Sequence, residues 1–349
     1  MDRRQADARH HRLKTWAAGA ALLSVLPGAA WAQEHAAGAE GVFSIVVEND
    51  SLSSGADRNY TSGIKFTYVS PDDGVPDWLR GSGGFTRAFS GSAPDFWGIA
   101  IGQSIFTPQD ITAVPAPADQ HPYAGWLYLQ IMVGAEDDRA NPRFLDTYEL
   151  ELGLVGPSAL GEEAQRGIHQ WLGAPDPQGW DSQLHDEVAF AVSFDRRWSP
   201  AWARLSTNFG GGLEFDLTPN AGATLGTLRT EARVGLTARM GWRIDNDYGP
   251  PRVRPSLSGV EHFEGGRLSW QIFAGVQGRA VARNLFLDGN TFEDSASVER
   301  NPYVADFQTG FSLSAGDWRI AYTYVWRTEE FETQTERQDF GALAVSVRM

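Results

Sequence analysis

The sequence predicts an all-β protein: a twelve-stranded antiparallel transmembrane β-barrel with a short helix in one external loop. The first observation is a period of two that recurs along most of the 349 residues. The second is length, because many alternating runs extend well beyond the roughly 5 or 6 residues usual for strands of soluble proteins. The third is that charges lie in the middle of one face and aromatic residues at the ends of the other, as expected for a wet lumen and a lipid-facing band.

The stretch 228–242 illustrates the alternation. Apolar side chains such as Val234 and Leu236 occupy its even positions, and charged ones such as Glu231 and Arg233 its odd positions. A soluble sandwich also alternates in this way. The length of the strands and the charges at their centres favour the membrane barrel.

Residues 1–32 have the three parts of a secretory signal peptide: a basic start, an apolar run and an Ala30-Trp31-Ala32 cleavage site. We expect cleavage after Ala32, and a single outer-membrane barrel domain over residues 33–349 of an exported bacterial protein. No later stretch is apolar for 18 residues, so no transmembrane helix is expected.

Charge and composition narrow the possible partners. The chain has 29 basic and 44 acidic residues, and loss of the leader removes five basic and two acidic ones, which leaves a net charge of −18. Nucleic-acid phosphates would be repelled, so no nucleic-acid partner is expected. Because cysteine is absent, disulfides and cysteine-ligated metals are excluded.

Twelve alternating segments are expected to form the wall, an even number as in bacterial single-chain barrels. They are 42–50, 60–70, 96–106, 124–135, 143–155, 186–197, 204–217, 225–242, 268–282, 303–314, 318–328 and 338–349. Three connections are short, at 137–142, 199–200 and 315–317, and each follows an even-numbered strand. The even-to-odd connections are therefore expected on the periplasmic side and the odd-to-even loops on the external rim.

The segment 156–173, between the fifth and sixth strands, interrupts the period of two and predicts the external helix. Ser158 is the expected N-cap, and Gly173 is expected to end the helix. Apolar residues recur at helical spacing at Leu160, Ala164, Ile168, Trp171 and Leu172. Gln165 and His169 are four residues apart and therefore share one helical face.

Polar residues from distant parts of the chain meet on the external rim in this topology. Asn49, Asp50 and Thr61 come from the first odd-to-even loop, and Gln165 and His169 come from the third. These five residues are called the rim cluster below. The second such loop carries His121 and Tyr123.

The rim cluster has the groups that ester hydrolysis requires. His169 is suited to act as a general base and Gln165 to orient it or the water. Asp50, with nearby loop carbonyls, is suited to bind Ca²⁺, and Asn49 and Thr61 offer donors to an oxyanion. Arg58, Lys65 and Tyr123 are the expected substrate contacts, the first two for a lipid phosphate. Non-catalytic alternatives stay open: His169 as a solvated surface histidine, Asn49-Asp50 as a simple turn, and Lys65 as a side chain that fills the lumen.

A set of motifs resembles the outer-membrane lipid A 3'-O-deacylase family. They are Asn49-Asp50, Asp57-Arg58-x-Tyr60-Thr61-x-Gly63, Gln103-x-x-Phe106-Thr107-Pro108, Pro122-Tyr123-Ala124-Gly125-Trp126-Leu127-Tyr128, Gly156-Pro157, Gln165-x-x-x-His169 and Trp180-x-x-Gln183. The resemblance implies a twelve-stranded barrel that removes the 3'-linked acyloxyacyl group of lipid A with Ca²⁺. It also implies that His169 activates water with support from Gln165, and that Asn49, Asp50 and Thr61 form the metal and oxyanion side.

Two departures from the family pattern accompany the resemblance. Pro175 stands where the family places a glutamate six residues after the histidine, and residues 108–120 contain no lysine or arginine. The expected function is a Ca²⁺-dependent lipid A esterase, a monomer acting on lipopolysaccharide among the outer-membrane lipids. The alternatives are a phospholipase-type lipase and a non-catalytic structural or narrow-channel barrel.

Overall fold

The computed structural model describes residues 41–52, 59–72, 74–81, 86, 90–206, 212–244 and 268–349. The expected signal peptide and Arg58 lie outside these ranges. The twelve long strands are β1 (Val42–Asn49), β2 (Asn59–Val69), β3 (Phe96–Thr107), β4 (Ala124–Asp137), β5 (Arg143–Val155), β6 (Glu187–Ser199), β8 (Leu213–Gly226), β9 (Arg229–Trp242), β10 (Ser269–Asn284), β11 (Tyr303–Ala315), β12 (Trp318–Arg327) and β13 (Gln338–Arg348).

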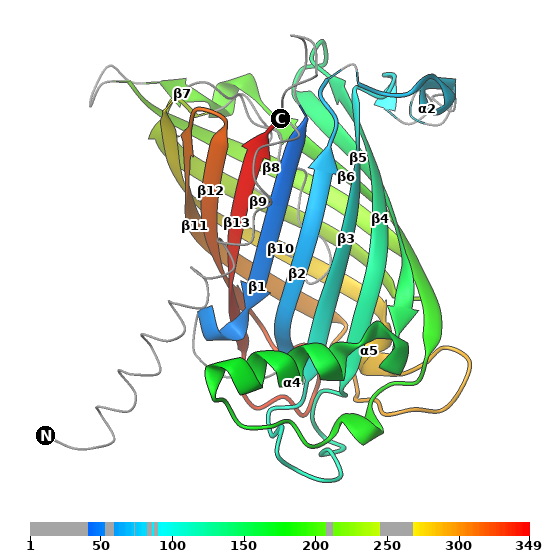
Figure 1. Cartoon of the computed structure of the whole chain (residues 1–349). Helices are drawn as coiled ribbons and strands as arrows, with labels where there is room; N and C mark the ends of the chain where they lie inside the picture. The colour runs from blue at the N-terminus through cyan, green and yellow to red at the C-terminus, as the bar shows by residue number, and fades with distance from the viewer. Residues whose placement is uncertain are drawn as a thin grey trace, which may run out of the picture.

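These strands close into an antiparallel barrel, as the sequence predicts (Figure 1). The first and last strands pair along β1 and β13, with Val42 opposite Arg348. A second closure joins β6 to β8, with Ala191 opposite Gly226. The short strand β7 (Leu205–Ser206) only extends the edge of β8 beyond the end of that pairing.

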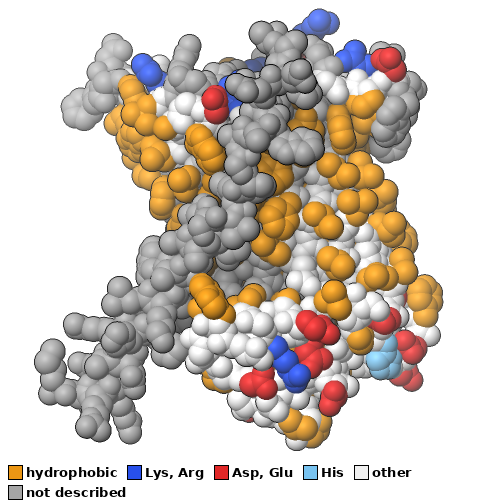
Figure 2. All heavy atoms as spheres, in the orientation of Figure 1, with side chains coloured by type: hydrophobic (Ala, Val, Ile, Leu, Met, Phe, Trp, Pro, Cys, Tyr) orange, Lys and Arg blue, Asp and Glu red, His pale blue; other side chains and the backbone are white. Residues whose placement is uncertain are grey.

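The alternating apolar and polar residues of the strands lie on the two opposite faces of the barrel wall. On β9 and β10, Leu236 and Ile272 are exposed on the outside, whereas Arg233 and Gln271 are buried in the lumen. Hydrophobic side chains cover much of the visible wall in Figure 2. The period of two therefore assigns these facing directions correctly, as expected where every second residue meets lipid.

One strand differs from its expected position. The sequence places the seventh strand at 204–217, but β8 occupies Leu213–Gly226, and Ser199–Pro200 is not a tight turn. Proline lacks an N–H and normally ends a ladder. Pro219 is tolerated in β8 because it lies just beyond Asn220, the last residue of β8 that pairs with β6.

The helical segments gather at the two ends of the barrel. The helix α4 (Gly161–Leu172) and the short helix α5 (Leu285–Asp288) lie at the lower end in Figure 1, and α2 (Asp77–Gly81) at the upper end. Three 3-10 turns matter below: η2 (Asp50–Leu52), η3 (Pro157–Ala159) and η4 (Trp180–Ser182). Among the described residues, no helix has both the length and the hydropathy of a membrane-spanning segment.

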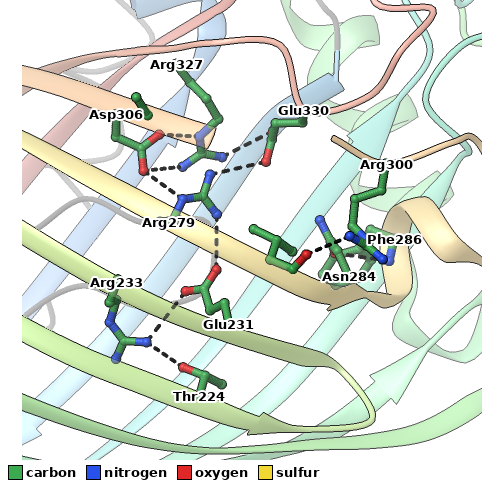
Figure 3. A network of polar contacts seen from close by, with 12 residues as sticks. Thr224, Glu231, Arg233, Arg279, Asn284, Phe286, Arg300, Asp306, Arg327 and Glu330 are labelled. Atoms are coloured by element: carbon green, nitrogen blue, oxygen red, sulfur yellow. Dashed lines mark hydrogen bonds and ion pairs between the residues drawn. The ribbon is translucent and has the colours of Figure 1, made fainter. Parts of the chain in front are cut away.

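Ion pairs cross the lumen side of half the wall (Figure 3). Arg279 of β10 lies 3.1 Å from Asp306, 3.3 Å from Glu231 and 3.4 Å from Glu330. Arg327 contacts Asp306 and Glu330 at 2.6 and 3.3 Å. These five residues, with Arg233, Asp195 and Thr224, are called the lumen network below. Its members come from β6 and from β8 to β12, together with the segment after β12, so they tie neighbouring strands together inside the barrel.

Candidate functional site

The predicted helix is present, and it lies against the outer face of the wall at the rim. Its N-terminal end packs on β4, where a side-chain carbon added to Gly125 would lie 3.1 Å from the backbone nitrogen of Gly161. Just before the helix, the Ala159 carbonyl accepts a hydrogen bond from the Gln103 side chain at 2.7 Å. Gly125 and Gln103 are on the same faces of their strands as exposed Leu129 and Ile101, so the contact is outside the barrel.

Small apolar and aromatic residues form the layer between helix and wall. Ile105, Tyr123 and Trp180 form a buried cluster against which Ala164 of α4 packs. The rings of Tyr123 and Trp180 have centroids 4.8 Å apart. The Tyr123 hydroxyl donates to the Ile111 carbonyl at 3.1 Å. Tyr123 therefore lies beneath the site as a packed wall residue, and its hydroxyl is already engaged.

Gln165 is held in one orientation by this layer. The indole Nε1 of Trp180 donates to the Oε1 of Gln165 at 2.8 Å. The Nε2 of Gln165 is buried and has no hydrogen-bond partner among the described residues. A buried amide donor without a partner is costly, so it is poised to bind an acceptor such as a carbonyl oxygen.

His169 lies one turn further along the same buried face of α4. Its Nδ1 is 2.5 Å from the carbonyl oxygen of Pro175. A carbonyl only accepts, so Nδ1 carries the hydrogen and Nε2 keeps the lone pair. The position where the family pattern has a glutamate thus supplies a backbone acceptor instead. His169 is also in the last turn of the helix, where the helix dipole favours positive charge.

The other members of the rim cluster lie at the ends of β1 and β2. Asn49 is the last residue of β1 and pairs with Ser62, next to Thr61. Thr61 is buried and its Oγ1 lies 2.6 Å from the Oγ1 of Thr107 on β3. Asp50 is also buried and opens the turn η2.

The strand β3 links the two parts of the cluster. Thr107 and Ile105 are two residues apart on one face of this strand, about 7 Å along it. Thr107 contacts Thr61, and Ile105 packs on Trp180, which in turn binds Gln165. The ends of β1 and β2 and the helix α4, which are distant in sequence, therefore lie at the same end of the barrel and are linked through the outer face of β3.

Residues 17–349 match the family model described as "Outer membrane protein LpxR". The chain belongs to the LpxR family. Its fold is similar to that of LpxR from Salmonella typhimurium, with a TM-score of 0.70 and 20% identity over 88% of this chain and 100% of that chain. The β domain of the Bordetella autotransporter BrkA is less similar, with a TM-score of 0.42 and 9% identity over 89% of this chain and 100% of that chain. A comparison with curated proteins finds no match.

Family membership and the closed barrel identify an outer-membrane protein. In this LpxR family member, Lys65 is separated from the rim cluster. Its side chain is buried in the lumen, where it interacts electrostatically with Glu48 and Glu151. The expectation that Lys65 meets a lipid phosphate is therefore wrong, because its strand position turns it away from the lipid side. The other expected phosphate contact, Arg58, lies outside the described residues.

His121 is also directed away from the outer face. Its ring stacks on Phe106 with centroids 5.4 Å apart, and its Nδ1 lies 2.7 Å from the Pro122 carbonyl oxygen. Burial lowers the pKa of His121 below its ordinary value, although the Pro122 carbonyl and the charge of Glu330 act in the opposite direction. His121 is therefore a neutral packing residue, which favours His169 as the base.

The donor set near η2 fits a calcium ion in kind. Asp50 and Asn49 offer a carboxylate and an amide oxygen, which are hard ligands of the type that Ca²⁺ prefers. The described residues contain no group of three or more His, Cys, Asp or Glu side chains that would hold a metal by themselves. Backbone carbonyls and water would therefore have to complete the roughly six to eight oxygen ligands.

Sequence reasoning assigned no role to three residues that build the site. Trp180 orients Gln165, Thr107 binds Thr61, and Gln103 fixes the start of the helical segment. All three lie in the motifs that carry the family resemblance, and membership of these motifs was the sequence feature that could have identified them. The roles themselves depend on three tertiary contacts: Gln103 of β3 with the segment before α4, Thr107 of β3 with β2, and Trp180 of η4 with α4.

Proposed function

We propose that this chain is a Ca²⁺-dependent esterase that removes the 3'-linked acyloxyacyl group of lipid A in the outer leaflet. The observation that carries the proposal is the buried face of α4, where Gln165 and His169 lie against the wall at the external rim. Membership of the LpxR family supports it, and the motif resemblance to lipid A 3'-O-deacylases supplies the substrate class.

In the proposed reaction, His169 acts as the base through its Nε2. The water oxygen attacks the ester carbonyl carbon while its proton passes to Nε2. The same proton then passes to the departing sugar oxygen as the carbon–oxygen ester bond breaks. The products are a free acyloxyacyl acid and a sugar hydroxyl. The carbonyl of Pro175 holds the imidazole in the required tautomer throughout.

The negative charge on the carbonyl oxygen needs donors in the transition state. The Nε2 of Gln165 is suited to this role because it is buried, oriented by Trp180 and without another hydrogen-bond partner among the described residues. Thr61 and Asn49 are further donors from the opposite side of the cluster. Asp50 and Asn49 would hold the calcium ion. When bound, Ca²⁺ supplies Lewis-acid stabilisation of the developing charge.

The alternative of a narrow channel is opposed by the lumen network. Arginine and acidic side chains from five strands pair with one another inside the barrel, and several of these arginines are almost completely buried. Twelve-stranded barrels have a narrow interior that such side chains largely fill. A channel also has no need for the rim cluster on its outer face.

Mass spectrometry of lipid A tests the proposal. Cells that produce the wild-type chain should yield lipid A lighter by the mass of the 3'-acyloxyacyl group, and cells that produce His169→Ala should not. Phospholipids extracted from the same cells are analysed in parallel. Unchanged lipid A with newly formed lysophospholipid would replace the lipid A assignment by a phospholipase, while unchanged lipids of both classes would contradict an esterase.

A further inference from the structure

The helix α4 buries its polar side and exposes its apolar side. The buried residues Gly161, Gln165 and His169 face the wall. The apolar residues form a stripe at helical spacing on an adjoining side: Leu160, Ala164, Ile168, Trp171 and Leu172. Within this apolar stripe, Leu160 is 53% exposed, Ile168 43% and Trp171 60%.

This arrangement is the reverse of what water imposes on a surface helix. A helix on a soluble domain turns its apolar stripe to the core and its polar side to solvent. Three large apolar side chains left together in water are unfavourable by about 25 cal/mol for each Å² of exposed apolar surface. The stripe is therefore more stable in an apolar environment than in water, and the protein itself does not cover these side chains.

The barrel shows where that environment is. The segment that leads into α4 is bound to the Gln103 side chain, and Ile101, two residues away on the same outer face of β3, is 53% exposed. The helix start packs on Gly125, and Leu129, four residues along the same face of β4, is 43% exposed. The stripe thus begins within about 14 Å of side chains that already face lipid.

The third side of α4 is polar. Glu163 and Gln170 are exposed, and Arg166 lies 2.9 Å from Glu162. At 100° per residue these four positions occupy the side of the helix opposite the apolar stripe. In Figure 2, charged side chains gather at the lower end of the molecule, and hydrophobic side chains cover the wall above them. A wall-facing, an apolar and a polar side are the features of a helix held at a membrane boundary.

We propose that α4 is an interfacial helix whose apolar stripe lies among the acyl chains of outer-leaflet lipids, while its Glu163–Gln170 side stays in the aqueous headgroup layer. Trp171 is placed where tryptophans anchor membrane proteins, at the boundary between the acyl chains and the headgroups. The helix then fixes the depth of the rim cluster relative to the membrane. This inference depends only on the placement of the barrel in a membrane, and it holds whether or not the chain is an esterase.

The absence of cysteine makes the test direct, because one introduced cysteine is the only labelling site. Four variants carry a nitroxide spin label: Ile168→Cys and Trp171→Cys on the stripe, Gln170→Cys as the polar control on the same helix, and Leu129→Cys as the lipid-facing reference. Each full-length barrel is refolded into phosphatidylcholine vesicles, and folding is checked by heat-modifiable gel mobility. Collision rates of the label with lipid-soluble oxygen and with a water-soluble nickel chelate are then measured.

The two stripe positions should resemble position 129, with nickel collision several-fold below that at position 170 and oxygen collision above it. Nickel accessibility at positions 168 and 171 equal to that at 170 would overturn the proposal. The same two collision rates are measured in a detergent-solubilised sample as a second reading. If the low nickel accessibility at 168 and 171 came from burial against protein, oxygen accessibility would also be low there, and this result too would contradict the proposal.

Discussion

The Nδ1 of His169 and the carbonyl oxygen of Pro175 are 2.5 Å apart, and this contact decides which imidazole nitrogen is basic. The tautomer leaves Nε2 as the proton acceptor. His169→Ala should therefore lower ester hydrolysis by roughly 10²–10⁴-fold, the usual contribution of a general base. The measurement is fatty-acid release from purified protein in vesicles, over a range of Ca²⁺ concentrations.

Measuring hydrolysis over a range of Ca²⁺ concentrations distinguishes loss of the base from loss of the proposed metal ligand. Activity lost in Asp50→Ala should return in part at high Ca²⁺, because removal of one ligand weakens binding and leaves the base in place. Activity lost in His169→Ala should not return at any Ca²⁺ concentration. His185→Ala is the matched control, since this external histidine is 53% exposed and lies beside Glu293. Wild-type hydrolysis by purified His169→Ala would exclude the His-water mechanism.

The second prediction concerns the docking of α4 on the wall. A side-chain carbon at Gly125 would lie 3.1 Å from Gly161 and 3.2 Å from the Cβ of Ala159, so Gly125→Leu must displace the helix. Displacement by about 1 Å can cost about 100-fold in rate. We expect a loss of that order in hydrolysis with a barrel that still shows heat-modifiable mobility. Gly278→Leu is the control, because a side-chain carbon there meets nothing within 4 Å; equal losses in both variants would contradict the docking role.

Much of the wall could be predicted from sequence, because a lipid-facing strand must alternate and alternation is local. The helix 161–172 was also predictable from its period and from Gly173, which has a φ of 69° at the helix end. Its N-terminus was not: Ser158 does not cap it but binds Asp186, and Leu160 occupies the cap position. The position of β8 was missed because Pro219 is acceptable only where the neighbouring strand has already ended.

The site was less accessible to sequence reasoning than the fold. Strand parity predicted which loops share the external rim. It did not predict that α4 lies outside the wall, because that depends on the close approach of Gly125 and Gly161. Nor did it predict that the helix buries Gln165 and His169 in preference to its apolar stripe, since an amphipathic pattern alone implies the opposite.

The third prediction tests the lipid-facing band. Val276 is the eighth residue of the 16 in β10 and is exposed on the outer face. Val276→Arg should reduce the free energy of unfolding by about 2–4 kcal/mol, the cost of a cation near the bilayer midplane. Denaturant titration of the barrel in vesicles measures this change, and Val276→Leu is the control. Loss of less than half a kcal/mol would contradict the assigned facing of β10, by the usual size of neutral surface substitutions.

The fourth prediction concerns the lumen network. Arg279 is nearly buried and contacts Glu231, Asp306 and Glu330. Arg279→Met removes the cation and leaves these carboxylates near one another in the lumen. Removal of one partner from a buried ion pair typically costs about 3–5 kcal/mol, and we expect a loss in that range in the same titration. Arg279→Met and Asp306→Asn together should cost less than the sum of their separate losses, because both remove the same ion pair; strictly additive losses would contradict the ion-pair account of the lumen.

The last prediction follows from the buried imidazole of His121. Burial lowers its pKa, so His121 is neutral in the folded barrel and protonates more readily once the chain unfolds. Below about pH 6.5 the unfolded chain therefore binds more protons at this histidine than the folded chain does. The contribution of His121 to the free energy of unfolding is present above that pH and is lost as the pH falls towards the pKa of His121 in the folded state. His121→Phe keeps the stacking on Phe106 but removes the hydrogen bond to Pro122, at a cost of about 1 kcal/mol at pH 7. Because phenylalanine does not titrate, the stability difference between wild type and variant should narrow between pH 7 and pH 5. Denaturant titrations of both proteins across this range measure the difference, and a gap that widens on acidification would show that His121 is charged in the folded state.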